Sequence, residues 1–541
     1  MACEALEYVR RAAAAIALPI LIASCWPAFA AEPAPPPSVE VTAFQVSGNT
    51  LVTAEAIERA LSPFKGRRTL EELGAAARAV QRLYVAMGYG GVVAYVPPQT
   101  RSDGIISIVV VEGRVSAVNV RGAQAFNEAN IRASLPDLVI GATPRMRRID
   151  AQMQISNENP SKRVRVLLKP GNGPGETEAE VTVEEGSVRH LTLALDNTGT
   201  SGTGDYRASV AWQHANLTGH DDVFTAQFQT SPTQPDRVKV VSAGYRFPRY
   251  RQLMVIDAFA AYSDVDGGSV PTAAGDLRFN GNGRIAGVRG TWYLPRFANA
   301  DQRVSLGVDT REYLNRCGIA GLPAGACGAA GASVSVQPLS LGYSLQSEGA
   351  PAFGLSASLQ TNLKLGGRYS DAASFAAVRP DARVHYTALH YSAFASMEVA
   401  ESWDLRLRVA GQYSGDALVP GEQYGIGGAT SVRGYQEREV LGDQGLLVSV
   451  ELTGPNLMPL VGPADRVLRV FAFADAAHAF NHFGTPCLGA SARCTLASLG
   501  IGTRFEWGKL QARLALANAL RDAVRTRKND SRAHFSIVYT I

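Results

Sequence analysis

The sequence carries little charge and no large excess of either sign. Aspartate, glutamate, lysine and arginine make up 18% of its 541 residues, and the formal net charge is only +4. Soluble domains usually contain roughly 25% charged residues. A charge balance this even, with no basic stripe along the chain, argues against a nucleic-acid-binding protein, so we predict no nucleic-acid partner.

Long apolar runs are absent beyond the N-terminus. The longest run covers residues 12–31, and no later segment offers the about 20 apolar residues that a membrane-spanning helix needs. The mean hydropathy of −0.02 excludes a polytopic helical membrane protein. Glycine, in contrast, is abundant, with 53 residues. One class of membrane protein stays open, the β-barrel, because each of its strands gives only a weak signal.

Motifs for catalysis and cofactor binding are also missing. No Gly-x-Ser-x-Gly elbow occurs, and the histidines form no cluster of metal ligands. The glycine run at 425–428 lacks the third glycine of a dinucleotide-binding fingerprint, because Thr430 stands in its place. We therefore predict no enzymatic activity, no metal and no cofactor.

The first 30 residues have the parts of a secretory signal peptide. Arg10 and Arg11 precede the apolar run, and small residues at 28–30 provide a cleavage site. Cleavage before Cys25, as in a lipoprotein, is the alternative. Four prolines follow within 33–37, so residues 31–41 are predicted to form an extended linker.

Four cysteines remain beyond the signal peptide, and they form two local pairs. Cys317 is close in sequence to Cys327, and Cys487 is close to Cys494, each pair within a segment rich in small residues. A zinc site would need closer Cys-x₂₋₄-Cys spacing. In an exported protein, paired loop cysteines indicate disulfides, so we predict Cys317–Cys327 and Cys487–Cys494 bridges.

A tandem repeat follows the linker. Val46-Ser-Gly48 recurs as Val120-Arg-Gly122, and Glu112-Gly113 recurs as Glu185-Gly186. The two offsets are 74 and 73 residues, and a period this long with matched ends indicates two copies of one small domain. We place the copies at 42–114 and 115–188.

The first copy is predicted to run strand, helix, helix, strand, strand. A short strand covers 44–48, and Thr53 is a candidate N-cap for the first helix. Thr69-Leu-Glu-Glu72 is a capping box that opens the second helix. Strands over 92–97 and 105–111 complete the unit. The middle of the second copy gives no clear pattern.

From residue 189 onward the hydrophobic pattern alternates with a period of two. Such strands fit a barrel with lipid outside and a polar lumen inside, and a soluble sandwich is the alternative. A sandwich of this size would usually divide into two domains, whereas no linker is visible here. An even number of strands, as closed bacterial barrels have, begins near residues 189, 205, 221, 237, 252, 283, 303, 333, 353, 382, 402, 444, 466, 495, 509 and 532.

The repeated domains determine which connections of such a barrel face outward. If they lie in the periplasm, the first strand starts there, and odd-to-even connections are external. Both cysteine pairs and the longest connection, 417–443, then lie outside, where long connections are expected. The chain ends in a strand, as outer-membrane barrels do, although Ile541 replaces the usual terminal aromatic residue.

Several motifs join this pattern to a known family. They are Asn157-Glu-Asn-Pro160, Lys169-Pro-Gly-Asn-Gly-Pro-Gly175, Asp196-Asn197-Thr-Gly199 with Thr203-Gly204 and Tyr206-Arg207, the loop motif Val432-Arg433-Gly434-Tyr435, and Phe473-Ala-Asp475-Ala-Ala477. With two repeated domains and sixteen strands, the mature chain resembles the two-partner secretion transporters (TpsB family, haemolysin secretion/activation proteins). The repeated units resemble their POTRA domains.

The resemblance implies a mostly β fold. Two periplasmic α+β POTRA domains would precede a 16-stranded transmembrane β-barrel, residues 189–541, in the bacterial outer membrane. In that superfamily the long external loop folds back into the barrel, and its arginine reaches an acidic residue on the wall. The matching pair here is Arg433 and Asp475, and a guanidinium shielded from water does favour a carboxylate. A solvated loop arginine is the alternative.

The resemblance also implies a function. POTRA domains would take hold of an unfolded exoprotein, a TpsA-like haemolysin or adhesin with an N-terminal secretion domain, and the barrel would secrete it without nucleotide hydrolysis. Outer-membrane lipids and the barrel-assembly machinery are the other expected partners. Residues 31–41 are too short and too rich in proline for the plug helix that such transporters often carry, so the loop alone is expected to occlude the pore. A barrel-assembly insertase, a passive porin-like channel and an outer-membrane hydrolase are the alternative functions.

Overall fold

The structure is a computed structural model that describes residues 37–541 with several gaps. The gaps are residues 101–102, 201, 265–267, 273–274, 280–281, 315–328, 330–331, 348 and 464. The predicted signal peptide, most of the predicted linker, and both Cys317 and Cys327 lie outside the described residues. No described helix is long and apolar enough to cross a membrane.

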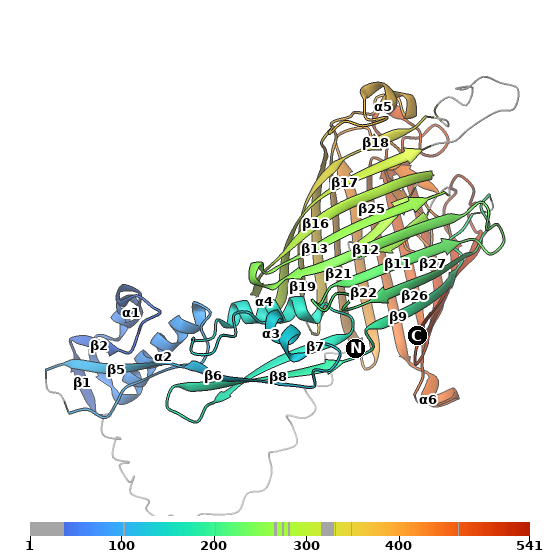
Figure 1. Ribbon diagram of the computed structural model, residues 1–541. Helices are drawn as coiled ribbons and strands as arrows, with labels where there is room; N and C mark the ends of the chain where they lie inside the picture. Colours follow the sequence, from blue (N-terminus) through green and yellow to red (C-terminus); the bar gives the residue numbers. More distant parts are fainter. Residues whose placement is uncertain are drawn as a thin grey trace, which may run out of the picture.

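The chain forms a barrel with two small α+β units attached end to end at one of its rims (Figure 1). We call the rim that carries these units the proximal rim and the opposite one the distal rim. Both chain ends of the barrel lie near the proximal rim, because the first strand starts there and the last strand returns to it.

The first α+β unit has the predicted order of elements. A three-stranded sheet in the order β2-β5-β4 is packed against two helices, and β2 runs parallel to β5. Thr53 and Thr69 cap the helices as expected, the latter in a complete capping box with Glu72. The elements are β2 (Ala43–Ser47), α1 (Ala54–Leu61), η1 (Ser62–Phe64), α2 (Leu70–Ala86), β4 (Val92–Tyr95) and β5 (Ile105–Glu112).

The predicted linker 31–41 is wrong at its C-terminal end. Residues Ser38–Val41 form strand β1, which pairs with β3 (Gly66–Thr69) in a small antiparallel ribbon. Val41 is buried against Leu73 and Ile106, so the chain is already part of the first unit there. The predicted linker therefore extends too far at this end, and its residues 31–36 lie outside the described residues.

The second unit repeats the same order, although its helices left no clear pattern in the sequence. Helix α4 starts without a side-chain cap at Arg145, and polar residues, among them Gln152 and Ser156, occupy its buried positions. Its periodicity is therefore hidden. The elements are β6 (Arg114–Arg121), α3 (Glu128–Ser134), α4 (Met146–Asn157), β7 (Lys162–Pro170) and β8 (Glu176–Glu185), in a sheet ordered β6-β8-β7.

The repeated residues hold the same turn in both units. The Glu112 carboxylate accepts backbone N–H groups of Thr50 and Leu51 at 2.7 and 2.9 Å. Glu185 accepts three N–H groups, those of residues 124–126, at 2.7–3.1 Å. Burial alone would raise the pKa of Glu112, but the hydrogen bonds from Thr50 and Leu51 outweigh it and lower that pKa.

The repeated glycine is required for a different reason. Gly48 adopts φ +83°, and a Cβ atom there would collide with the carbonyl oxygen of Val110; Gly122 has the same φ and meets Val183 in the same way. We expect Gly48→Ala to destabilise the first unit by about 2–4 kcal/mol, from backbone strain and steric overlap. Hydrogen exchange of the full-length protein in detergent measures this as lost protection across residues 43–112.

A glycine on the same unit provides the control for that prediction. Gly74 lies inside α2 with ordinary helical dihedrals, and a Cβ there meets only the end of the Arg78 side chain, at 3.4 Å. Gly74→Ala should therefore stabilise the helix by up to about 1 kcal/mol. Unchanged protection in Gly48→Ala would show that the repeated glycine is not structurally required.

Sixteen antiparallel strands close the barrel, as predicted. The last strand pairs with the first, and β18 and β19 form one strand interrupted at Gln337. In order they are β9 (Arg189–Asp196), β10 (Arg207–His214), β11 (Val223–Thr230), β12 (Lys239–Arg249), β13 (Met254–Ser263), β16 (Asn282–Phe297), β17 (Ala300–Leu314), β18 (Val334–Val336) with β19 (Pro338–Ser347), β20 (Ala352–Asn362), β21 (Thr387–Ala400), β22 (Trp403–Ser414), β25 (Gln444–Asn456), β26 (Val467–Phe480), β27 (Arg493–Trp507), β28 (Leu510–Ala519) and β29 (Ser531–Thr540).

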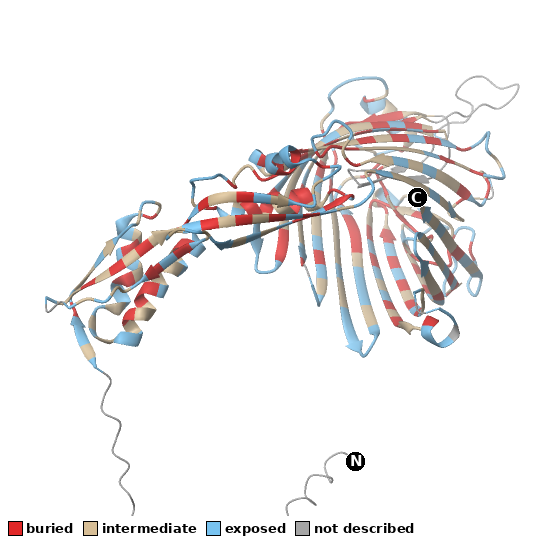
Figure 2. Cartoon of the chain, turned by 60° about the horizontal axis from the view of Figure 1, so that its bottom comes forward, coloured by how far each residue is buried: buried red, intermediate tan, exposed pale blue. Residues whose placement is uncertain are grey.

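Burial alternates along these strands (Figure 2). Outward positions are apolar and exposed, as at Leu499 and Ile501, whereas inward positions carry polar or small residues. Connections at the proximal rim are mostly tight turns, apart from the short helices η2 (Tyr250–Gln252) and α6 (Met458–Val461). Distal connections are longer and contain the hairpin β14 (Gly268–Thr272) and β15 (Gly275–Phe279), helix α5 (Ala372–Val378), β23 (Tyr424–Ile426) with β24 (Val440–Gly442), and η4 (His482–Gly484).

The second unit is fixed to the proximal rim by buried polar contacts. Lys162 of β7 forms an ion pair with Asp221 in the turn before β11, at 2.6 Å, and both side chains are almost completely buried. The Tyr250 hydroxyl donates to the same carboxylate at 2.6 Å. From the motif at 157–160, Glu158 binds Arg246 and Asn159 donates to a backbone carbonyl of the β10–β11 turn. That motif therefore builds the joint between the second unit and the barrel.

Candidate functional site

The long distal connection folds into the barrel. Its stem is the hairpin β23–β24, and the segment between these strands carries the motif Val432-Arg433-Gly434-Tyr435. Val432 and Tyr435 are fully buried. They pack in one apolar cluster with inward residues of the barrel wall, among them Leu447, Ala477 and Leu496. We call residues 415–443 the inner loop.

Arg433 and Asp475, which the family resemblance paired, are in direct contact. Nε and one terminal nitrogen of the guanidinium each donate to a different oxygen of Asp475, both at 2.7 Å. The backbone N–H of Arg433 donates to the same carboxylate at 3.1 Å. The Asp475 side chain is completely buried, so this two-point ion pair is shielded from water.

The wall around Arg433 supplies more than the predicted carboxylate. The guanidinium stacks on the ring of Phe473, 3.4 Å from the ring centroid, in a cation–π contact. Its other terminal nitrogen donates to Glu451 at 2.7 Å. Glu451 also binds Arg504 and Arg513, the latter at 2.8 Å. The sequence motifs did not reveal Glu451, because it lies on β25 outside any recognised motif.

Gly434 and Tyr435 complete the tip of the inner loop. Gly434 adopts φ +95°, a conformation that favours glycine, and its N–H donates to His534 Nε2 at 2.9 Å. The Tyr435 hydroxyl lies 2.9 Å from the carbonyl oxygens of two different segments, Ala497 and Arg521, and shares its one hydrogen between them. Together with the contacts of Arg433, the tip is thus held on four strands, β25, β26, β27 and β29, and on one distal connection.

A second anchor holds the distal end of the inner loop. The Asp443 carboxylate accepts both terminal nitrogens of Arg379, at 2.5 and 2.8 Å, and the backbone N–H groups of Leu418 and His482. Burial alone would raise the pKa of Asp443, but the hydrogen bonds from Arg379 and the two backbone groups outweigh it and lower that pKa. Three distal connections therefore meet at one carboxylate.

A third anchor lies closer to the barrel wall. Glu422 of the inner loop binds Arg311 at 3.0 Å and accepts hydrogen bonds from Tyr313 and Gln360 at 2.7 and 2.8 Å. Neither this anchor nor Asp443 was predicted. Their arginine partners, Arg379 for Asp443 and Arg311 for Glu422, are 64 and 111 residues away in sequence, so no local pattern could indicate them.

One predicted cysteine pair lies at the distal connection between β26 and β27. Cys487 and Cys494 are joined by a disulfide, and Cys494 belongs to the same apolar cluster as Val432. Cys317 and Cys327 lie outside the described residues, so their bridge stays a prediction.

Peptide mapping under non-reducing conditions tests both bridges. We expect one peptide pair that contains Cys487 and Cys494 and a second that contains Cys317 and Cys327. Each short bridge is expected to stabilise its loop by about 2–3 kcal/mol, because it restricts the unfolded chain. Free thiols at these positions, or pairing between the two loops, would contradict the assignment.

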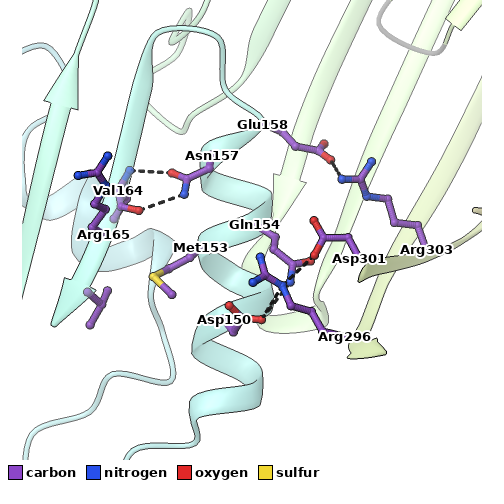
Figure 3. A pocket seen from close by; sticks show the side chains of 11 residues that line it. Asp150, Met153, Gln154, Asn157, Glu158, Val164, Arg165, Arg296, Asp301 and Arg303 are labelled. Atoms are coloured by element: carbon purple, nitrogen blue, oxygen red, sulfur yellow. Dashed lines mark hydrogen bonds and ion pairs between the residues drawn. The ribbon is translucent and has the colours of Figure 1, made fainter. Parts of the chain in front are cut away.

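A polar pocket opens where the second unit meets the proximal rim (Figure 3). Its volume is about 470 Å³, and it lies between α4, strand β7 and the barrel strands β16 and β17. Arg296 bridges Asp150 of α4 and Asp301 of the barrel at 3.2 and 2.8 Å, and Arg303 binds Glu158 at 2.9 Å. Within the described residues, no group of His, Cys, Asp and Glu side chains could hold a metal ion.

Comparison with known proteins places the barrel and the α+β units in one family. The model for "Haemolysin secretion/activation protein ShlB/FhaC/HecB" matches residues 175–505, and the model for "POTRA domain, ShlB-type" matches residues 39–113. The outer membrane transporter CdiB of Dickeya dadantii is 24% identical over 434 residues, which cover 76% of this chain and 71% of that protein. The heme/hemopexin transporter protein HuxB of Haemophilus influenzae is 20% identical, covering 74% of this chain and 70% of its own length.

The fold is likewise similar to solved structures. CdiB from Escherichia coli superposes with a TM-score of 0.78 at 19% identity, covering 97% of this chain and 94% of that chain. CdiB from Acinetobacter baumannii gives a TM-score of 0.70 at 15% identity, covering 93% and 90%. The chain therefore belongs to the haemolysin secretion/activation (ShlB/FhaC/HecB) family and is an outer-membrane transporter of the two-partner secretion type, with POTRA domains on the periplasmic side.

Proposed function

We propose that the protein binds an unfolded exoprotein in the periplasm through its POTRA domains and secretes it through the barrel. The observation that supports this most directly is the open edge of β7, which lies beside the pocket at the periplasmic rim. An extended chain can add to such an edge by main-chain hydrogen bonds, which accept many sequences.

Asn157 illustrates how this edge accepts a partner. Its side-chain amide accepts the N–H of Val164 at 2.6 Å and donates to the C=O of the same residue at 3.0 Å, as a neighbouring strand would. Hydrogen-bonding direction alternates along an antiparallel strand, so Val166 and Leu168 direct their backbone groups to the same side. No other strand in the described part of the chain pairs with this edge. A strand added there would point toward Arg296 and Asp301 at the proximal rim.

The energy for export would come from folding of the exoprotein outside the cell. The chain has no nucleotide-binding motif, and a polypeptide that folds after it emerges cannot return through the barrel. The expected client is a TpsA-like haemolysin or adhesin with an N-terminal secretion domain. Outer-membrane lipids would surround the apolar outer face, and the barrel-assembly machinery would insert the chain.

Secretion of the exoprotein encoded beside this chain tests the function. Co-expression with its N-terminal secretion domain should bring that domain to the cell surface, whereas the exoprotein alone should stay in the periplasm. An insertase would instead change the levels of other barrels, and a porin would admit small solutes without exporting protein. Absence of surface exoprotein at normal transporter levels would refute the proposal.

A proline at the β7 edge tests the entry site. Val166→Pro removes one outward N–H donor while leaving the pairing with β8 in place, so the secretion domain should lose most of its binding. Val166→Ala is the matched control, because it keeps the N–H group and should bind nearly as the original chain does. Equal binding by both variants would exclude this edge as the entry site.

A further inference from the structure

One contact of the inner loop depends on a histidine that neither the motifs nor the proposed function includes. His534 lies on β29, the strand that closes the barrel, and only 5% of its surface is exposed. Its Nε2 accepts the backbone N–H of Gly434 at 2.9 Å. No other hydrogen bond from the tip of the loop reaches β29 among the described residues.

The contact requires a neutral imidazole. A ring nitrogen accepts a hydrogen bond only when it carries no proton, and both nitrogens of an imidazolium are donors. A proton on Nε2 would therefore oppose the N–H of Gly434 across 2.9 Å. The other ring nitrogen, Nδ1, is buried and has no hydrogen-bond partner in the described structure. The surroundings of the ring therefore offer no second acceptor for a proton on the imidazolium.

The charged groups around His534 do not offset a proton there. Arg433 approaches from the inner loop and Arg532 from β29 itself, and both are cations. Asp475 on β26 is the facing anion, but its oxygens already accept three hydrogen bonds from Arg433 and one from Ser449. Ala515, the partner of His534 on β28, is apolar. A positive charge on His534 would thus be repelled by two arginines, and the oxygens of the one nearby carboxylate are already engaged in hydrogen bonds.

We infer that His534 is a positioning residue that holds the tip of the inner loop only in its neutral form, so that acid loosens the tip. The inference rests on the proposed function only in that the inner loop occupies the export path. An imidazole that is released with the loop has an ordinary pKa of about 6.5, whereas a proton on Nε2 of the bound imidazole would break its hydrogen bond with Gly434. Because only the released imidazole takes up a proton, lowering the pH from 7.5 to 5.5 increases the ratio of released to bound loop about tenfold.

The anchor at Asp443 does not share this pH range. The pKa of the external Asp443 is lowered, so its carboxylate stays ionised from pH 7.5 to 5.5, and its contribution is lost only in stronger acid. A change in loop position between these two pH values therefore reports on the tip and not on the Arg379 contact.

Single-channel conductance of the full-length protein in planar lipid bilayers tests the inference. We expect about tenfold more open time at pH 5.5 than at pH 7.5. His534→Gln, which presents a neutral acceptor at both pH values, should keep the low open time throughout. His534→Ala should give high open time at both. His478→Gln is the matched control, because this exposed imidazole of β26 bonds Thr495 and does not touch the inner loop.

Two outcomes would overturn the inference. One is an unchanged pH response in His534→Gln, with His534→Asn as a second neutral variant if the first fails to assemble as a heat-modifiable barrel. The other is a wild-type channel whose open time does not change between the two pH values. Conductance needs no exoprotein, so this result is independent of the secretion test and distinguishes failure of the inference from failure of the proposed function.

Discussion

Replacing Arg433 with alanine is expected to release the inner loop and to reduce exoprotein secretion sharply, while the barrel still assembles. The substitution leaves the buried Asp475 carboxylate without a cation, which costs about 3–5 kcal/mol. Glu451 loses less, because Arg504 and Arg513 still bind it. Strand pairing and the lipid-facing surface are untouched, so the amount of transporter in the outer membrane should stay normal.

The measurement is secretion at matched outer-membrane levels, together with channel conductance, which should become larger or noisier. Asp475→Ala should give a similar defect, and the double variant should be little worse than either single one, as coupled residues require. The charge swap Arg433→Asp with Asp475→Arg should recover only in part, because Glu451 faces the same position and the stacking on Phe473 is lost.

Arg408→Ala provides a control inside the same lumen. Arg408 of β22 donates to the carbonyl of Thr430 at 2.9 Å from an exposed position. Its loss therefore removes a cationic contact to the loop without leaving a buried charge unpaired. Its effect on secretion should be small. Normal secretion by Arg433→Ala would show that the loop arginine has no role in transport.

The second large effect is expected at the joint between the POTRA domains and the barrel. Lys162→Met leaves Asp221 buried with only the Tyr250 hydroxyl as donor, which should weaken docking of the second POTRA domain by about 3–5 kcal/mol. Burial lowers the pKa of Lys162, and the attraction of Asp221 offsets this lowering only in part. Faster hydrogen exchange in α4 and in the 215–222 turn, with reduced secretion, is the expected result.

Two further variants make that result specific. Lys162→Met with Asp221→Asn removes both charges and should recover much of the docking, because a buried ion pair can often be replaced by uncharged groups at little cost. Lys169→Met is the control on the same strand. The contact of Lys169 with Glu180 is exposed to solvent and contributes at most about 1 kcal/mol, so its loss should have little effect. Unchanged exchange in Lys162→Met would mean that the apolar contacts of α4 with the barrel are sufficient for docking.

Much of the fold follows from the sequence for simple physical reasons. A strand between lipid and an aqueous lumen must alternate apolar and polar residues, so the period of two revealed all sixteen strands. The repeated Gly48 and Glu112 marked two copies of one unit because each copy needs the same turn. Polar residues on the buried face of α4 hid that helix, and the proline run concealed the start of β1.

The sequence by itself determined the architecture, because alternation, repeats and short motifs are local, and the family resemblance of its motifs implied the inner loop and the pairing of Arg433 with Asp475. Only the tertiary structure decided which other groups hold that loop: Glu451, His534, and Arg379 at Asp443. The same is true of Lys162 and Asp221 at the joint. These contacts join segments that are distant in sequence, and they depend on the register of the strands and the closure of the barrel. Any of these side chains, considered alone, is an ordinary polar residue, and its role arises only when closure brings its partner within hydrogen-bonding distance.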